Sequence, residues 1–236
     1  QGRWPWPRSK IATLVDRLSQ DGAKVIGFDI GFLEPDENSQ LGFIRTFRQQ
    51  VEALGIKDHQ IGDFLRESQT NADNDLTLAN AIERSSAAVV LGYFFHMNAA
   101  ELGSRLDQND RDQQFRRISS SKYPFILYAA QAMNGAPFFS AYAPESNLDV
   151  LSEAAASSGY FSLRSDQDGI VRWMPLMIQA GEDLFPPLSV WCAWHYLDKP
   201  HLAVEVGHYG VNGVRMGAQF IPTNENGQLL INYLGP

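Results

Sequence analysis

Hydrophobic residues recur with two different periods in the first part of the chain, and each period predicts a type of element. Across residues 10–21, apolar residues lie three and four positions apart, which is typical of the buried face of a helix. Ser9 is the predicted N-cap of this helix and Gly22 its left-handed stop. Residues 25–30 are apolar on both alternating faces, which predicts a strand covered on both sides within a parallel sheet.

The same alternation continues to about residue 95 and predicts a partly parallel sheet flanked by helices. Four further elements follow from caps, stops and apolar periodicity. The first two are a helix capped by Asn38 or Ser39 and stopped at Gly55, and a short helical piece at 61–65. The others are a helix that begins at the cap-forming cluster 71–75 and a buried strand at 87–95. A polar segment, 98–122, comes next. It is predicted to be a loop or insertion that leaves the second strand and folds over the sheet edge as a lid.

The second half of the chain predicts mainly antiparallel structure. Its expected elements include helices at 124–133, 148–156 and 187–197, the first of which is stopped by Asn134–Gly135. They also include an antiparallel hairpin formed by 159–163 and 170–178 around a turn at 166–169. A β-meander from 202 to 233, with turns at Asn212–Gly213 and Asn226–Gly227, completes the chain. The fold class is therefore mixed α/β, parallel in the N-terminal half and antiparallel in the C-terminal half. We expect one domain, 1–236.

Composition narrows the classes of partner. With 44% hydrophobic residues in 236, the chain can fill one core. The net charge of −8 argues against nucleic acid, whose phosphates call for a basic surface. A single cysteine, Cys192, excludes an internal disulfide and a cysteine-based zinc site. No apolar run approaches the ~18 residues of a membrane span.

Acidic residues gather where the first predicted strand ends. Asp29, Glu34 and Asp36 lie at the carboxyl edge of the sheet, where open α/β sheets bind ligands, and Asp75 and His96 are expected nearby. Carboxylate oxygens suit calcium or magnesium, so the first three are candidate metal ligands. A small organic ligand over the same edge is the equal alternative. It also remains open that Asp29 caps backbone amides or pairs with Arg3 or Arg8 while the others face water.

Four short pieces of the chain, in this order, resemble one family: Trp4-Pro5-Trp6-Pro7-Arg8, then 22–30 with Glu34-Pro35-Asp36, then Asp168-Gly169-Ile170-Val171-Arg172, and finally 227–236. The family is the cyclase/histidine-kinase-associated sensory extracellular domain of the second type, the CHASE type-two domain. The resemblance implies an extracytoplasmic sensor, periplasmic or extracellular, anchored by membrane helices on both sides. It also implies a cytoplasmic output, either an adenylate or guanylate cyclase, a diguanylate cyclase, a histidine kinase or a Ser/Thr kinase, and a homodimeric receptor.

We therefore expect a non-enzymatic domain that senses a small molecule, an ion or an extracytoplasmic protein. Two alternatives belong to other classes. One is a hydrolase or phosphatase-like enzyme that uses Asp29 as nucleophile or metal ligand. The other is a protein-interaction module that binds through aromatic residues such as Phe138, Phe139 and Tyr142.

Overall fold

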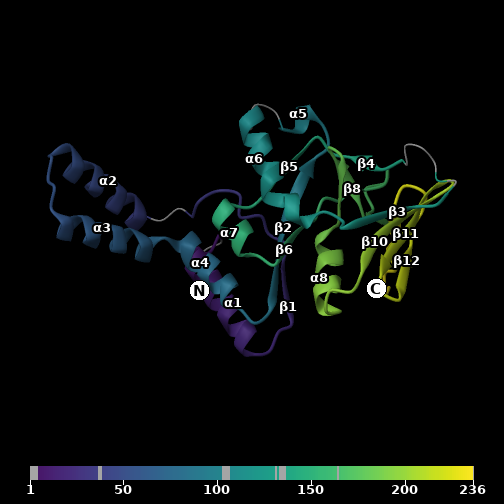
Figure 1. Ribbon diagram of the computed structural model, residues 1–236, viewed down its shortest axis with the longest axis horizontal. Helices are drawn as coiled ribbons and strands as arrows, with labels where there is room; N and C mark the ends of the chain where they lie inside the picture. Colours follow the sequence, from purple (N-terminus) through teal and green to yellow (C-terminus); the bar gives the residue numbers. More distant parts are fainter. Residues whose placement is uncertain are drawn as a thin grey trace.

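The computed structural model describes residues 5–36, 39–102, 107–130, 132, 137–163 and 165–235. The predicted cap Asn38, the Asn134–Gly135 helix stop and Trp4 lie outside these residues. The N-terminal half contains α1 (Arg8–Gln20), β1 (Val25–Phe28), α2 (Ser39–Ala53), α3 (His59–Ala72), α4 (Asn74–Glu83) and β2 (Ala88–His96) (Figure 1). The predicted order of helices and strands is therefore confirmed for this half.

Helix α1 forms where its apolar period predicts it. Ile11 and Val15 are buried in the core, and the chain leaves the helix at Gly22, whose φ of +85° suits glycine. The N-cap prediction was wrong. The helix begins at Arg8, one residue before Ser9, and Pro7 occupies the cap position without a side-chain hydrogen bond. A proline is compatible with this position, because its backbone there is extended (ψ 142°) and the helix needs no hydrogen bond from its nitrogen.

The first sheet is organised around β2. Strand β1 pairs with it in parallel, from Val25 opposite Ala88 to Phe28 opposite Leu91, and β6 (Ser157–Tyr160) also pairs with it in parallel. The end of β2 pairs antiparallel with β5 (Ala143–Glu145). One face of β1 is buried, because Ile26 and Phe28 face a cluster with α1 and α4. On its other face, Val25 is partly buried toward α8 (Leu188–Tyr196), and Gly27 is exposed. The predicted parallel pairing of this strand is confirmed, whereas its second face is covered only in part.

The C-terminal half adds smaller sheets around a second core. Its elements are α7 (Asp149–Ala154), β7 (Trp173–Pro175), β8 (Ile178–Ala180), β9 (Asp183–Phe185), α8 (Leu188–Tyr196), β10 (Leu202–Gly207), β11 (Gly210–Met216), β12 (Gln219–Pro222) and β13 (Gln228–Leu230). Strands β10, β11 and β12 form the predicted antiparallel meander. Strand β8 pairs antiparallel with β9, and β4 (Phe139–Ser140) pairs with β8 in parallel.

Three local predictions were wrong. The helix predicted at 124–133 is wrong, because 125–128 are β3 (Phe125–Tyr128), which pairs in parallel with β10. The segment 170–178 supplies β7 and the start of β8, and β7 pairs with β13 rather than with β6. Asn212–Gly213 lies inside β11, and the turn between β10 and β11 is at His208–Tyr209.

The described residues of the polar segment 98–122 are largely helical and do not form the predicted loop. It contains α5 (Ala99–Leu102), α6 (Gln108–Ile118) and the 3-10 turn η1 (Ser119–Ser121). Asp107 caps α6 in a reciprocal capping box with Asp110, so the alternating charges belong to the wet face of a helix. Helix α6 packs against β5 and α7. Arg117 and Gln113 both hydrogen-bond to Asp149 of α7.

Helices α2 and α3 form an antiparallel hairpin that projects away from the rest of the protein (Figure 1). Asp58 caps α3 by accepting hydrogen bonds from the amides of Gln60 and Ile61. Helix α3 is much longer than the predicted helical piece at 61–65. Asp73 alone, in extended conformation, separates α3 from α4. Among the described residues, no helix is both long enough and apolar enough to cross a membrane.

Candidate functional site

A cleft of about 790 Å³ lies where β1 ends and the chain turns back toward the start of α1. Its walls are mainly apolar, and its polar groups come from Arg8 and from the acidic loop that follows β1. The cleft is lined by Pro5, Pro7, Arg8, Ile30, Gly31, Phe32, Leu33, Glu34, Pro35 and Asp36. Ligand sites in proteins commonly combine such a concave apolar wall with a few fixed polar groups.

Arg8 is the central polar residue of this cleft. Its side chain is only 13% exposed, and its guanidinium carbon lies 4.8 Å from the centre of the Phe32 ring, in cation–π geometry. Its Nη2 donates a hydrogen bond to the carbonyl oxygen of Glu34 (3.2 Å), and its backbone N–H donates to Oδ2 of Asp36 (3.0 Å). The first residue of α1 therefore holds the loop after β1 in place.

The N-terminus of α4 supplies the other half of the network. The backbone N–H of Asp36 donates to Oδ2 of Asp75 (2.9 Å), and Nδ2 of Asn74 donates to Oδ2 of Asp36 (2.7 Å). Nε of Arg8 lies 3.5 Å from Oδ1 of Asp75. Three segments that are distant in sequence, the start of α1, the loop and the start of α4, are thus joined by charged groups beside the cleft.

The Arg8–Asp75 ion pair is incompletely satisfied. Nε of Arg8 and Oδ1 of Asp75 are both buried, and neither makes a hydrogen bond with the described residues. Burial raises the pKa of the Asp75 carboxyl above its ordinary value, against the opposing effects of the Asp36 amide and the Arg8 charge. A buried charged pair without full hydrogen bonding is costly, so a group that offered better hydrogen bonds to Arg8 would compete effectively with Asp75.

Phe32, which lies under Arg8, is anchored to the central strand by Asn147. The Phe32 amide donates to Oδ1 of Asn147 (2.7 Å), and Nδ2 of Asn147 donates to the carbonyl of Gly92 in β2 (3.0 Å). The Leu148 amide donates in turn to the Phe32 carbonyl (2.9 Å). Asn147 is fully buried. The floor of the cleft is therefore held rigidly against the first sheet.

The structure brings only some of the predicted site residues together. Asp36 and Asp75 meet, and Glu34 lies in the same loop with an exposed side chain, whereas Asp29 is exposed and does not line the cleft. His96 is at the far end of β2, where its Nε2 lies 2.7 Å from Oε2 of Glu145. Among the described residues, no group of three or more His, Cys, Asp or Glu side chains is placed to hold a metal ion.

Sequence reasoning named Arg8 only as a possible partner of Asp29, and it missed Asn74 and Asn147. Arg8 in fact pairs with Asp75, 67 positions away, and the sequence carries no local signal of that contact. Asn147 precedes a helix and has the sequence context of an ordinary cap. Its hydrogen bonds to Phe32 and Gly92 depend wholly on the tertiary fold.

Comparison with known proteins gives one match. A family model described as the CHASE2 domain matches residues 1–236, the whole chain. The comparisons with curated proteins and with solved structures found no match. The family match is therefore the comparison on which a functional conclusion rests.

Proposed function

Because the chain belongs to the CHASE2 domain family, we propose that it is the extracytoplasmic ligand-sensing domain of a receptor anchored in the cell membrane. The family consists of extracellular sensory domains of signalling receptors, and its role is sensory rather than catalytic. The catalytic output then lies in a separate cytoplasmic domain: a nucleotide cyclase, a diguanylate cyclase, a histidine kinase or a Ser/Thr kinase.

The ligand binds in the cleft beside Arg8, and the Arg8–Asp36–Asp75 network is the observation that carries this proposal. The apolar wall suits a small organic molecule, and the polar side requires at least one charged or hydrogen-bonding group on it. A calcium or magnesium ion is the alternative occupant, because Glu34 and Asp36 supply the hard oxygen ligands that these ions prefer.

Signal transmission follows from the position of Arg8. It is the first residue of α1 and directly follows the proline-containing segment that includes Pro5 and Pro7. A ligand that hydrogen-bonds to Arg8 better than Asp75 does favours an arrangement in which the starts of α1 and α4 have separated. Such a difference in affinity is what allows a ligand to shift an equilibrium between two arrangements.

The test is thermal unfolding of the 236-residue chain with a panel of amino acids, dicarboxylates, sugars, calcium chloride and magnesium chloride. A true ligand at 100 times its Kd stabilises the fold by about 2.7 kcal/mol. We expect this stabilisation to be lost in Arg8→Gln and Asp36→Asn but kept in Arg45→Gln, a matched change at an exposed position of α2.

Two results would contradict the proposal. Equal stabilisation of the wild type and of Arg8→Gln by the same compound would place the ligand outside the cleft. Hydrolysis of p-nitrophenyl phosphate by the wild type, abolished in Asp29→Asn, would support the enzyme alternative instead.

A further inference from the structure

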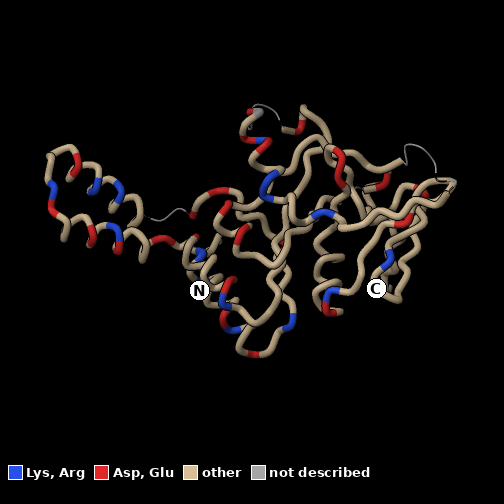
Figure 2. The backbone as a smooth tube through the Cα atoms, viewed as in Figure 1, with Lys and Arg blue, Asp and Glu red and all other residues tan. Residues whose placement is uncertain are grey.

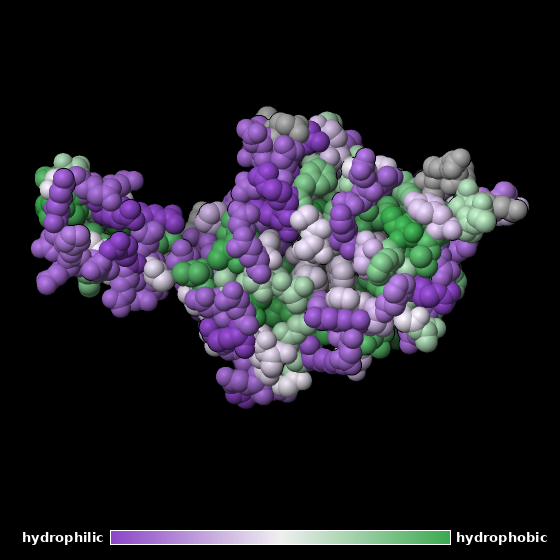
Figure 3. Space-filling model, in the orientation of Figure 1, coloured by the Kyte–Doolittle hydropathy of each residue, from purple (hydrophilic) through white to green (hydrophobic). Residues whose placement is uncertain are grey.

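The α2–α3 hairpin carries large apolar side chains on its surface. Phe43, Leu54 and Phe64 are 71%, 75% and 67% exposed, and Phe47 is also exposed. Phe43 and Phe47 stack on each other with ring centres 6.3 Å apart. In Figure 3, hydrophobic residues reach the surface at the outer end of the hairpin. An apolar patch of this kind marks an interaction surface.

These side chains lie on one side of the hairpin. Phe43 and Phe47 are four positions apart and therefore share one flank of α2, and Leu54 follows directly after the end of that helix. Phe64 and Asn71 share a flank of α3 for the same reason. Phe43 and Asn71 line the same hollow, so the two flanks face the same way. We call Phe43, Phe47, Leu54 and Phe64 the apolar face of the hairpin.

The opposite side of the hairpin is charged. Its two hollows are lined by Arg48 and Glu52 of α2 and by Gly62, Arg66 and Gln69 of α3. Arg48 there pairs with Glu52, and its Nη1 donates to Oε1 of Gln69 (3.3 Å). The charged side is therefore suited to water, whereas the apolar face is suited to a partner.

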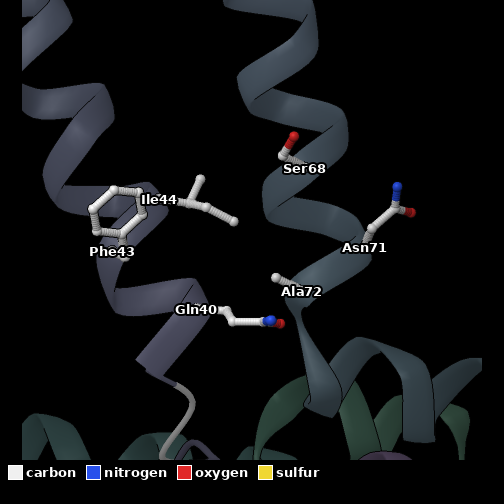
Figure 4. A pocket seen from close by; sticks show the side chains of 6 residues that line it. All are labelled: Gln40, Phe43, Ile44, Ser68, Asn71 and Ala72. Atoms are coloured by element: carbon white, nitrogen blue, oxygen red, sulfur yellow. The ribbon is translucent and has the colours of Figure 1, made fainter.

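The apolar face also contains a recess. A hollow of about 540 Å³ opens between α2 and α3, and Figure 4 shows Gln40 and Ile44 of α2 pointing into it toward Ser68 and Ala72 of α3. The small side chains of Ser68 and Ala72 leave room for a bulky group from outside. A phenylalanine ring is of suitable size and chemistry to fill such a space.

The charges of the hairpin favour a second copy as the partner. The hairpin holds four basic residues, Arg45, Arg48, Lys57 and Arg66, and four acidic residues, Glu52, Asp58, Asp63 and Glu67, whereas the whole chain carries −8. Basic and acidic residues are interspersed along both helices (Figure 2). Two hairpins can therefore approach without net repulsion, although other surfaces of the chain repel. An anionic membrane surface, in contrast, would call for a basic excess.

The exposed aromatic rings supply a large part of the area that such an interface needs. At about 200 Å² for a whole aromatic side chain, the exposed parts of Phe43, Phe47 and Phe64 offer roughly 370 Å² per copy. Two copies then bury roughly 700 Å² from these rings alone. That is more than half of the about 1,200 Å² at which specific interfaces begin, before Leu54 and the polar rim contribute.

We propose that the apolar faces of two copies pair around a two-fold axis, so that the two hairpins form a four-helix bundle. Phe43, Phe47 and Phe64 of each copy pack into the recess of the other. A two-fold arrangement uses the same patch on both copies, which is what a self-complementary ridge and recess provide. This pairing does not require a ligand in the cleft.

Sedimentation equilibrium of the 236-residue chain tests the pairing. We expect a monomer–dimer equilibrium whose Kd rises at least tenfold in Phe47→Glu and in Phe64→Glu. Gln49→Glu, which adds the same charge at an exposed position of α2 away from the apolar face, should leave the Kd unchanged. Far-UV circular dichroism of each variant shows whether the helices are retained.

Three outcomes would overturn the proposal: a wild-type chain that stays monomeric up to its solubility limit, a dimer that Phe47→Glu and Phe64→Glu leave intact, or a monomer that binds phosphatidylglycerol vesicles through these residues. Failure of the cleft proposal is distinguishable, since Arg8→Gln should dimerise normally and Phe64→Glu should keep its ligand-induced stabilisation.

Discussion

Replacing Asn147 with alanine tests how the loop that forms the cleft is held. The buried amide accepts a hydrogen bond from the Phe32 N–H and donates one to the Gly92 carbonyl. Alanine removes both partners from groups that water does not reach, and each loss costs about 1–3 kcal/mol. We expect the free energy of unfolding to fall by roughly 2–6 kcal/mol, out of the about 5–15 kcal/mol typical of a domain.

Urea denaturation followed by tryptophan fluorescence measures this change, since the chain has five tryptophans. Asn80→Ala is the matched control, because Asn80 is exposed on α4 and its loss should change stability by no more than about 0.5 kcal/mol. Asn147→Asp should be no better than alanine, because it keeps the acceptor for Phe32 but points a second acceptor at Gly92. A loss below about 1 kcal/mol in Asn147→Ala would refute the view that these bonds anchor the cleft.

Three further predictions concern the fold. A Cβ at Gly159 would lie 2.5 Å from the backbone N of Leu188, so Gly159→Ala should destabilise the protein by more than about 2 kcal/mol in the same denaturation assay. Gly42→Ala, within α2 and facing open space, should instead stabilise it by about 0.5–1 kcal/mol. Hydrogen bonds from Arg117 lower the pKa of the Asp149 carboxyl below its ordinary value of 3.8. The ionised carboxylate therefore stabilises the fold above that pH, and this stabilisation is lost as the pH falls through the lowered pKa. Wild type and Asp149→Asn should therefore differ most near neutral pH, by at most about 1 kcal/mol because Asp149 is half exposed, and the difference should vanish in acid.

Elements with strong local signals could be predicted from the sequence. Helix α4 follows the cap residue Asp73, and α1 has a clear apolar period that ends before Gly22. Residues 125–128 were misjudged because an apolar run of that length fits either a helix or a strand. Pairing with β10, in which Ala203 lies opposite Phe125, decides between them. Asn212–Gly213 imitates a hairpin turn, but Gly213 lies opposite Glu205, where the register of β10 and β11 shifts at a β-bulge.

The candidate site shows the same division between local and tertiary information. That the loop after β1 would face a cleft followed from the rule that ligands bind at the carboxyl edge of a parallel sheet. Which carboxylates meet there did not follow, because it depends on how α4 packs beside α1. That packing brings Asp75 to Arg8 and leaves Asp29 in solvent.

Because Asp73 alone separates α3 from α4, a small rotation of α4 can produce a larger displacement at the outer end of α3. Asp75 lies two positions beyond Asp73, about 3 Å along the axis of α4, whereas α3, with 14 residues, extends about 21 Å from it in the other direction. If Asp73 acts as a fulcrum, a small rotation of α4 at Asp75 moves the outer end of α3 roughly seven times as far. The hairpin is then a lever that amplifies events in the cleft.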